Sequence, residues 1–116
     1  KIRKCFGFFV RIIMQNIDDE FYERADQHIQ LSNQQITEAI GRGKVSASML
    51  YATSRFNAWV SATGWNTGEE LANAKEETIE YFLTEYRKML EENLDDYIEN
   101  FQEYMFIPPE SEIINE

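Results

Sequence analysis

One stretch with almost no charge constrains the fold of this chain. Residues Val45–Thr63 contain a single charged side chain, Arg55, although 28% of all residues are charged. A helix that is apolar or small on every side has to be covered by neighbouring elements. We therefore expect residues 45–63 to form one buried helix, covered by the flanking segments Asp18–Ile40 and Thr67–Met105, which carry apolar residues at helical spacing.

The length predicts one domain. A chain of 116 residues can build one hydrophobic core without metals or disulfides, but it is too short for two. We predict an all-α fold, a three-helix up-down-up bundle with a long third helix and an N-terminal extension. The predicted divisions are a basic and apolar extension at 1–13, a helical domain at 14–107 and an acidic tail at 108–116, with Met14 as the natural start.

The net charge is unevenly distributed along the chain, and it limits the classes of molecule that the chain can bind. Four of the eleven basic residues precede the first acid, Asp18, so residues 14–116 carry 7 basic and 21 acidic side chains, a net charge of −14. Such a surface repels nucleic acid and anionic lipid headgroups but is compatible with a basic protein partner. With Cys5 alone there is no internal disulfide, which suits the cytoplasm, and no apolar run is long enough to span a membrane.

Capping residues and glycines predict the ends of the first two helices. Asp and Ser side chains accept hydrogen bonds from free N–H groups at a helix start, and glycine is favoured just after a helix end. The predicted start and end are Asp18 or Asp19 and Gly41 for the first helix, and Ser46 or Ser48 and Gly64 for the second.

The third helix has the clearest start signal. The sequence Thr67-Gly68-Glu69-Glu70 is a capping box, and no Gly or Pro follows until Pro108. A helix from Glu69 to Met105 would reach roughly 55 Å, against roughly 33 Å for the first helix. We expect it to overhang, bend or break near 93–95, and to expose an interface covered by a second chain or by the extension. The candidate interface residues are Tyr86, Leu90, Tyr97, Phe101 and Tyr104.

Three stretches resemble a known family. They are Phe21–Asp26 (FYERAD), Lys44–Trp65 (KVSASMLYATSRFNAWVSATGW) and Tyr86–Met105 (YRKMLEENLDDYIENFQEYM). From about residue 21 to 105 the chain is similar to the small proteobacterial proteins of domain-of-unknown-function family 3144. The resemblance implies a cytoplasmic all-helical domain. It implies no activity, cofactor or catalytic residue, and residues 1–13 fall outside it.

Arg55 is the side chain that most needs an explanation in a buried helix. A guanidinium removed from water needs carboxylate or carbonyl partners. Counting along antiparallel helices predicts a structural ion pair of Arg55 with Glu77 or Asp26. The alternative is recognition of an anionic ligand by Arg55 with Tyr51, Asn57 and Trp59, although Arg55 and Asn57 do not share a helix face.

Other polar residues give weaker signals. The carboxylates of Glu91, Glu92, Asp95, Asp96, Glu99 and Glu103 are expected to form a solvated face, because calcium sites usually use a tight loop. His28 has no nucleophile in a recognisable motif and is expected at the edge of a helix stripe.

The sequence thus predicts no catalytic, cofactor-binding or metal-binding residues. Our leading hypothesis is a non-enzymatic interaction protein that self-associates, as a homodimer, through the distal part of the third helix. The alternative hypothesis is a binder of a small ligand or a divalent cation, near Arg55 or near the carboxylates between Glu92 and Glu103.

Overall fold

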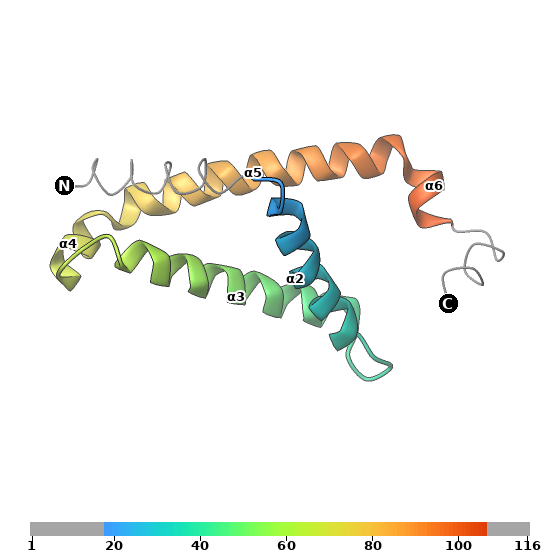
Figure 1. Ribbon diagram of the computed structural model, residues 1–116, viewed down its shortest axis with the longest axis horizontal. Helices are drawn as coiled ribbons and strands as arrows, with labels where there is room; N and C mark the ends of the chain where they lie inside the picture. The colour runs from blue at the N-terminus through green and yellow to red at the C-terminus, as the bar shows by residue number, and fades with distance from the viewer. Residues whose placement is uncertain (1–17, 107–116) are drawn as a thin grey trace. The chain divides into compact units, whose positions relative to one another are not determined.

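The computed structural model describes residues 18–106, and each regular element in this range is an α-helix (Figure 1). The all-helical prediction is therefore confirmed, whereas the predicted segments 1–13 and 108–116 lie outside the described residues. The helices are α2 (Phe21–Gln35), α3 (Arg42–Ala62), α4 (Gly68–Asn73), α5 (Lys75–Glu99) and α6 (Phe101–Met105).

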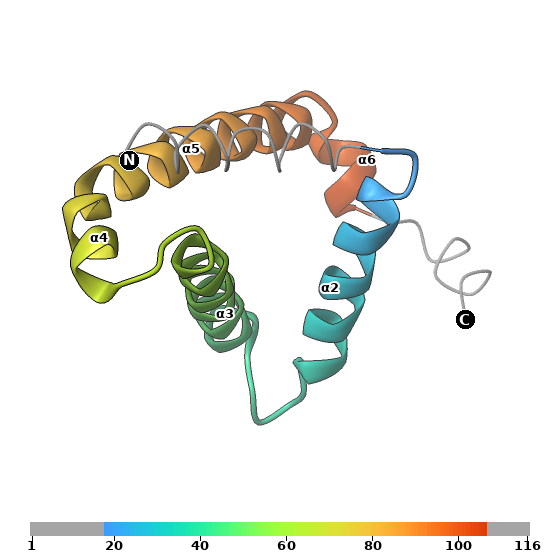
Figure 2. The ribbon, with the colours of Figure 1, turned by 60° about the vertical axis from the view of Figure 1, so that its left-hand side comes forward.

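The chain divides into two compact units. The first unit, Lys1–Thr78, contains α2, α3, α4 and the start of α5, and the second, Ile79–Glu116, contains the rest of α5 and α6. Within the first unit α2 contacts α3, and α3 contacts α4. A loop joins α2 to α3, as Figure 2 shows. None of the helices between residues 18 and 106 is long and apolar enough to cross a membrane.

Helix α2 is shorter than predicted at both ends. It begins after Glu20 rather than at the predicted Asp18 or Asp19, although the Asp18 carboxylate still accepts a hydrogen bond from the Glu20 N–H at 3.2 Å. It ends at Gln35, because Ile36 is extended and Thr37 forms a local turn. In that turn the Thr37 hydroxyl accepts from the Ile40 N–H at 3.1 Å, which competes with helical bonding.

Helix α3 begins earlier than predicted. Gly41, which was expected to end the first helix, is the N-cap of the second one and is extended rather than left-handed. Glycine is an accepted N-cap residue. The predicted caps Ser46 and Ser48 therefore lie inside α3. The other end agrees more closely with the prediction, since α3 ends at Ala62, two residues before Gly64.

The predicted capping box is confirmed at the start of α4. The Glu70 N–H donates to the Thr67 hydroxyl oxygen at 3.1 Å. The Glu70 carboxylate accepts from the N–H of Asn66 at 2.9 Å, one residue earlier than in the standard box. These bonds fix the turn between α3 and α4.

The predicted single helix over 69–105 is divided at two places, and neither is the predicted break at 93–95. The first is Ala74, which separates α4 from α5 and is 2% exposed. The second is Asn100, which separates α5 from α6. The Asn100 side-chain amide donates to the Asp96 backbone carbonyl at 3.0 Å and to its carboxylate at 2.9 Å, so the side chain binds back onto the last turn of α5.

The prediction that residues 45–63 form a buried helix is wrong for this chain. Among the described residues the buried side chains are Val45, Ser61, Ala74 and Tyr81. Phe56 and Trp59 in α3 are each 62% exposed. The physical reason is that α2 and α4 contact only part of α3, so its remaining sides stay in water. The three-helix up-down-up arrangement is not established by these contacts.

Candidate functional site

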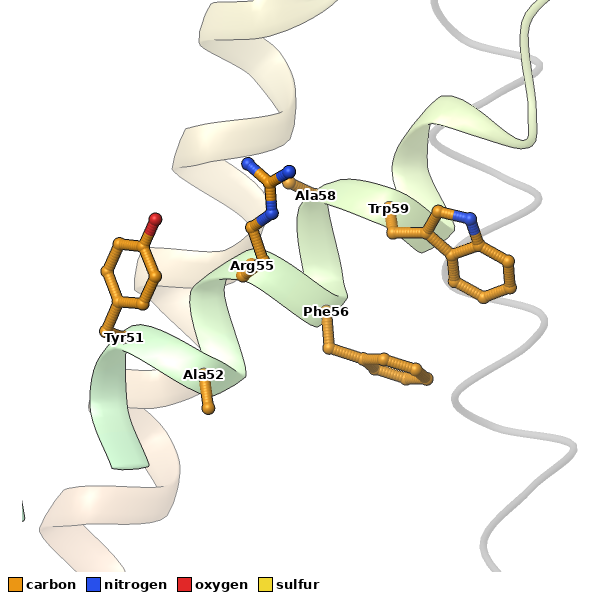
Figure 3. A pocket seen from close by; sticks show the side chains of 6 residues that line it. All are labelled: Tyr51, Ala52, Arg55, Phe56, Ala58 and Trp59. Carbon is orange, nitrogen blue, oxygen red and sulfur yellow. The ribbon is translucent and has the colours of Figure 1, made fainter. Parts of the chain in front are cut away.

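The exposed side of α3 forms an open hollow lined by aromatic rings, small side chains and one guanidinium (Figure 3). We call it the α3 surface. In Figure 3, Tyr51 and Arg55 extend to one edge, and the rings of Phe56 and Trp59 extend to the other. The two rings contact each other, with centroids 5.7 Å apart. The residues of the α3 surface are Tyr51, Ala52, Arg55, Phe56, Ala58 and Trp59.

The helical repeat separates this surface from the inward side of α3. At 3.6 residues per turn, the α3 surface covers about 160° of the helix circumference. The partly covered residues Met49, Asn57 and Val60 and the buried Ser61 lie on the other half, whereas the buried Val45 lies within the arc of the α3 surface but nearer the start of the helix. Asn57, which the ligand hypothesis grouped with Arg55, is therefore absent from the hollow. Between Val45 and Thr63 the exposed side of α3 carries Arg55 and the opposite side carries no charge, and only the opposite side is partly covered.

Hydroxyl groups along α3 bond to the helix itself. Thr53 donates to the Met49 carbonyl at 2.9 Å, and Ser61 donates to the Asn57 carbonyl at 2.9 Å. The hydroxyls of Ser48, Ser54 and Thr63 make similar bonds to carbonyls three or four residues earlier. The hydroxyl donors of these side chains are therefore already paired without water, although the residues are polar.

Arg55 does not make the predicted ion pair among the described residues. It is exposed on α3, whereas Glu77 and Asp26 lie on α5 and α2. The ion pairs between described residues join Arg24 to Asp18, Arg87 to Glu91 and Lys88 to Glu85. The predicted ion pair assumed that Arg55 is removed from water. Arg55 is exposed, so its guanidinium needs no carboxylate partner to offset burial.

A second exposed apolar surface runs along α5 within the second unit. We call it the α5 stripe. Its five side chains are 41–58% exposed and lie within about 80° of the helix circumference. At 1.5 Å per residue the stripe is about 21 Å long. Three predicted interface residues belong to it, and Leu83 could have been found by extending their spacing toward the N-terminus. The α5 stripe consists of Leu83, Tyr86, Leu90, Leu94 and Tyr97.

The other two predicted interface residues lie on α6, after the break at Asn100. Tyr104 packs edge-on against Tyr97, with ring centroids 5.1 Å apart, so α6 is held against the end of α5. Phe101 packs against Phe106 at 5.9 Å. Both predicted residues remain partly exposed, Phe101 at 48% and Tyr104 at 40%.

Two tyrosines in the second unit have shifted acidities. The Tyr104 hydroxyl donates to the Asp96 carboxylate at 3.3 Å, and the negative charge of Asp96 raises the Tyr104 pKa above 10.0. Burial, with a smaller contribution from the charge of Glu85, raises the pKa of Tyr81. Both phenols are therefore neutral at physiological pH and present apolar rings with a polar tip.

The described residues offer no arrangement for metal chemistry. No group of three or more His, Cys, Asp or Glu side chains between residues 18 and 106 is placed to hold a metal ion. His28 is exposed on α2. The six carboxylate side chains between Glu91 and Glu103 on α5 and α6 are all exposed, as predicted for a solvated face.

Comparison with known proteins places the chain in a family. Residues 21–98 match the family described as proteins of unknown function (DUF3144). The chain belongs to this family. A protein of known structure is similar in sequence and fold: the NMR structure of protein NB7890A from Shewanella sp. is 44% identical, with a TM-score of 0.63, over 77% of this chain and 94% of that one. A search of curated proteins gave no match.

Proposed function

We propose that this DUF3144 protein is a non-enzymatic interaction protein that self-associates as a homodimer. The single observation that carries the proposal is the small core of the described residues. Between residues 18 and 106 four side chains are buried, only three of them hydrophobic, whereas a domain of about this length normally buries a large apolar area. Of the 21 large hydrophobic side chains that are exposed among the described residues, eight lie on the α3 surface and the α5 stripe.

Self-association would supply the missing cover. The marginal stability of proteins depends on buried apolar surface, which offsets the conformational entropy lost on folding. The α5 stripe is a narrow line of Leu and Tyr side chains at helical spacing, the pattern that helices use to pack against one another. In this proposal, the three-helix up-down-up bundle predicted from the sequence forms in the assembled protein.

Measurement of mass in solution tests the proposal. Sedimentation equilibrium between about 1 and 100 µM protein is expected to show dimers. Tyr97→Glu, at a position 50% exposed, is expected to weaken dimerisation at least tenfold, because the interface would have to bury an unpaired carboxylate. Because the Tyr97 ring also packs on Tyr104, Leu90→Glu, at a position 41% exposed, provides a second variant that is expected to weaken dimerisation and leaves the contact between α5 and α6 intact.

A matched variant controls for the added charge. Thr84→Glu also adds one negative charge to an exposed position of α5, but about 100° from Leu83 and outside the stripe. It is expected to dimerise like the unaltered protein. A protein that remains monomeric at 100 µM would refute self-association, and equal weakening by both variants would refute the role of the stripe.

The α3 surface also favours a second candidate function, binding of a small anionic ligand. Arg55 lies in the hollow beside Tyr51 and Trp59, which are two of its three predicted companions. In a thermal-shift panel of anionic metabolites, a ligand at one hundred times its dissociation constant would stabilise the fold by about 2.7 kcal/mol. A shift that Arg55→Ala abolishes would support this function, and a panel without any shift would count against it.

A further inference from the structure

We infer that the α5 stripe of one protomer packs on the α3 surface of a second copy, and that the exchange is reciprocal. This inference rests on the self-association proposed above and specifies its geometry. The dimer then contains two equivalent contacts, each formed by α3 of one protomer and α5 of its partner. Both surfaces are available for such contacts, because Phe56 and Trp59 are each 62% exposed and the stripe residues are 41–58% exposed.

Charge is the first reason to pair these two surfaces. Helix α3 carries Arg42, Lys44 and Arg55 and no acid, a net charge of +3. Helix α5 carries three basic and nine acidic residues, a net charge of −6. Pairing α3 with α3, or α5 with α5, brings like charges together, whereas pairing α3 with α5 brings opposite charges together.

Arg55 gives this preference a specific position. It is the one charged residue of the α3 surface, so a symmetric contact between two α3 surfaces would place two guanidinium groups near the same interface. Along α5, Glu80 and Glu91 lie beside the stripe, about 60–80° from Leu83. Arg87 lies between them and the stripe, about 40° from Leu83, and pairs with Glu91 at 3.6 Å. A reciprocal contact allows Arg55 of each protomer to approach Glu80 of its partner.

The areas are sufficient for a stable dimer. Tyr51, Phe56 and Trp59 are 62–67% exposed, which leaves about 400 Å² of aromatic surface if each full side chain covers about 150–250 Å². An α5 stripe of similar area brings each contact to about 800 Å². Two contacts therefore bury about 1,600 Å², the usual size of a specific protein interface.

The hydroxyls of α3 remove a common obstacle to such burial. A polar side chain that loses its bonds to water at an interface destabilises the complex. The hydroxyls of Thr53 and Ser54 already donate to backbone carbonyls of α3, at 2.9 and 2.8 Å. Covering the neighbouring α3 surface therefore leaves these donors paired.

Mixing two variants tests the reciprocal arrangement. Trp59→Glu alters the α3 surface, and Leu94→Glu alters the α5 stripe; the two positions are 62% and 52% exposed. Each variant alone would have both contacts damaged and is expected to be monomeric at 50 µM. An equimolar mixture of the two has one undamaged contact, between α3 of the Leu94→Glu chain and α5 of the Trp59→Glu chain. Native mass spectrometry with one chain ¹⁵N-labelled is expected to show heterodimers.

The outcomes separate this inference from the proposed function. Dimers of Trp59→Glu as strong as those of the unaltered protein, with no heterodimer in the mixture, would overturn the reciprocal contact but keep self-association through α5. A monomeric unaltered protein would overturn both. Two monomeric variants that form no heterodimer would also overturn the exchange. Circular dichroism checks the folding of each variant, and Tyr51→Glu, at a position 67% exposed, replaces Trp59→Glu if that variant unfolds.

Discussion

Removal of the Thr67 hydroxyl is expected to destabilise the fold by a measurable amount. This hydroxyl accepts a bond from the Glu70 N–H at 3.1 Å, and the Glu70 carboxylate accepts from the Asn66 N–H at 2.9 Å. Replacing a capping Thr by Ala typically costs about 1 kcal/mol, within a range of about 0.5–2 kcal/mol. Thr67→Ala should therefore lower the free energy of unfolding by about 1 kcal/mol, and Thr67→Ser should preserve it.

Glu70→Ala extends this test. Because Asn66 is exposed, water can replace the carboxylate, and the expected loss is smaller, about 0.5 kcal/mol. Both bonds hold the same turn, so the double variant should lose less than the sum of the single losses. Urea unfolding at one fixed protein concentration measures the unaltered protein and the four variants, since association also contributes to apparent stability. A Thr67→Ala protein within about 0.2 kcal/mol of the unaltered one would refute the role given to this cap.

Three further predictions concern other described residues. Val45→Ala should cost about 1.5 kcal/mol in urea unfolding, because Val45 is 4% exposed and each buried methylene contributes about 0.8 kcal/mol; an unchanged midpoint would contradict its place in the core. Asp96→Asn should lower the raised pKa of Tyr104 toward 10.0, measured by phenolate absorbance. Because folding raises this pKa, the stabilisation by Tyr104 is present below its unfolded pKa and is lost as pH rises through the folded pKa; an unchanged titration would refute the coupling. Asn100→Ala should join α5 to α6, because Ala favours helix more than Asn and removes the amide bonds to Asp96; NMR shifts at residue 100 that stay non-helical would disprove this.

Local signals in the sequence predicted part of this structure. The capping box at Thr67 needs only two residues three positions apart, and both of its side chains bond as a cap. The helical spacing of Tyr86, Leu90 and Tyr97 likewise placed them on one face of α5. Such features depend on short stretches of chain, so the order of the residues is enough to predict them.

The breaks in the helices could not be predicted in the same way. Ala74 has the highest intrinsic helix propensity, yet it separates α4 from α5 and is buried. Its conformation is set by packing, which a propensity argument does not include. Gly41 shows a different difficulty, because glycine is common both after a helix end and at an N-cap, and here it is the N-cap.

Burial of α3 was the largest error, and its cause is physical. Composition indicates that a helix can tolerate removal from water, but it does not say which surface will cover it. Phe56 and Trp59 have side chains that tolerate burial, yet each is 62% exposed. The alternative hypothesis of an anion site named Tyr51, Arg55 and Trp59, which line the hollow, but it also included Asn57, which lies outside it.

The hydroxyls of α3 that donate to carbonyls of their own helix have a consequence for how this protein responds to dilution. Since Ser48, Thr53 and Ser61 satisfy their donors on their own helix, separating two protomers rehydrates rings and methyl groups but breaks none of these bonds. The helical far-ultraviolet signal should then stay constant over a concentration range in which the hydrodynamic radius falls. The helix content of α3 and the dimerisation of the protein can then change independently of each other.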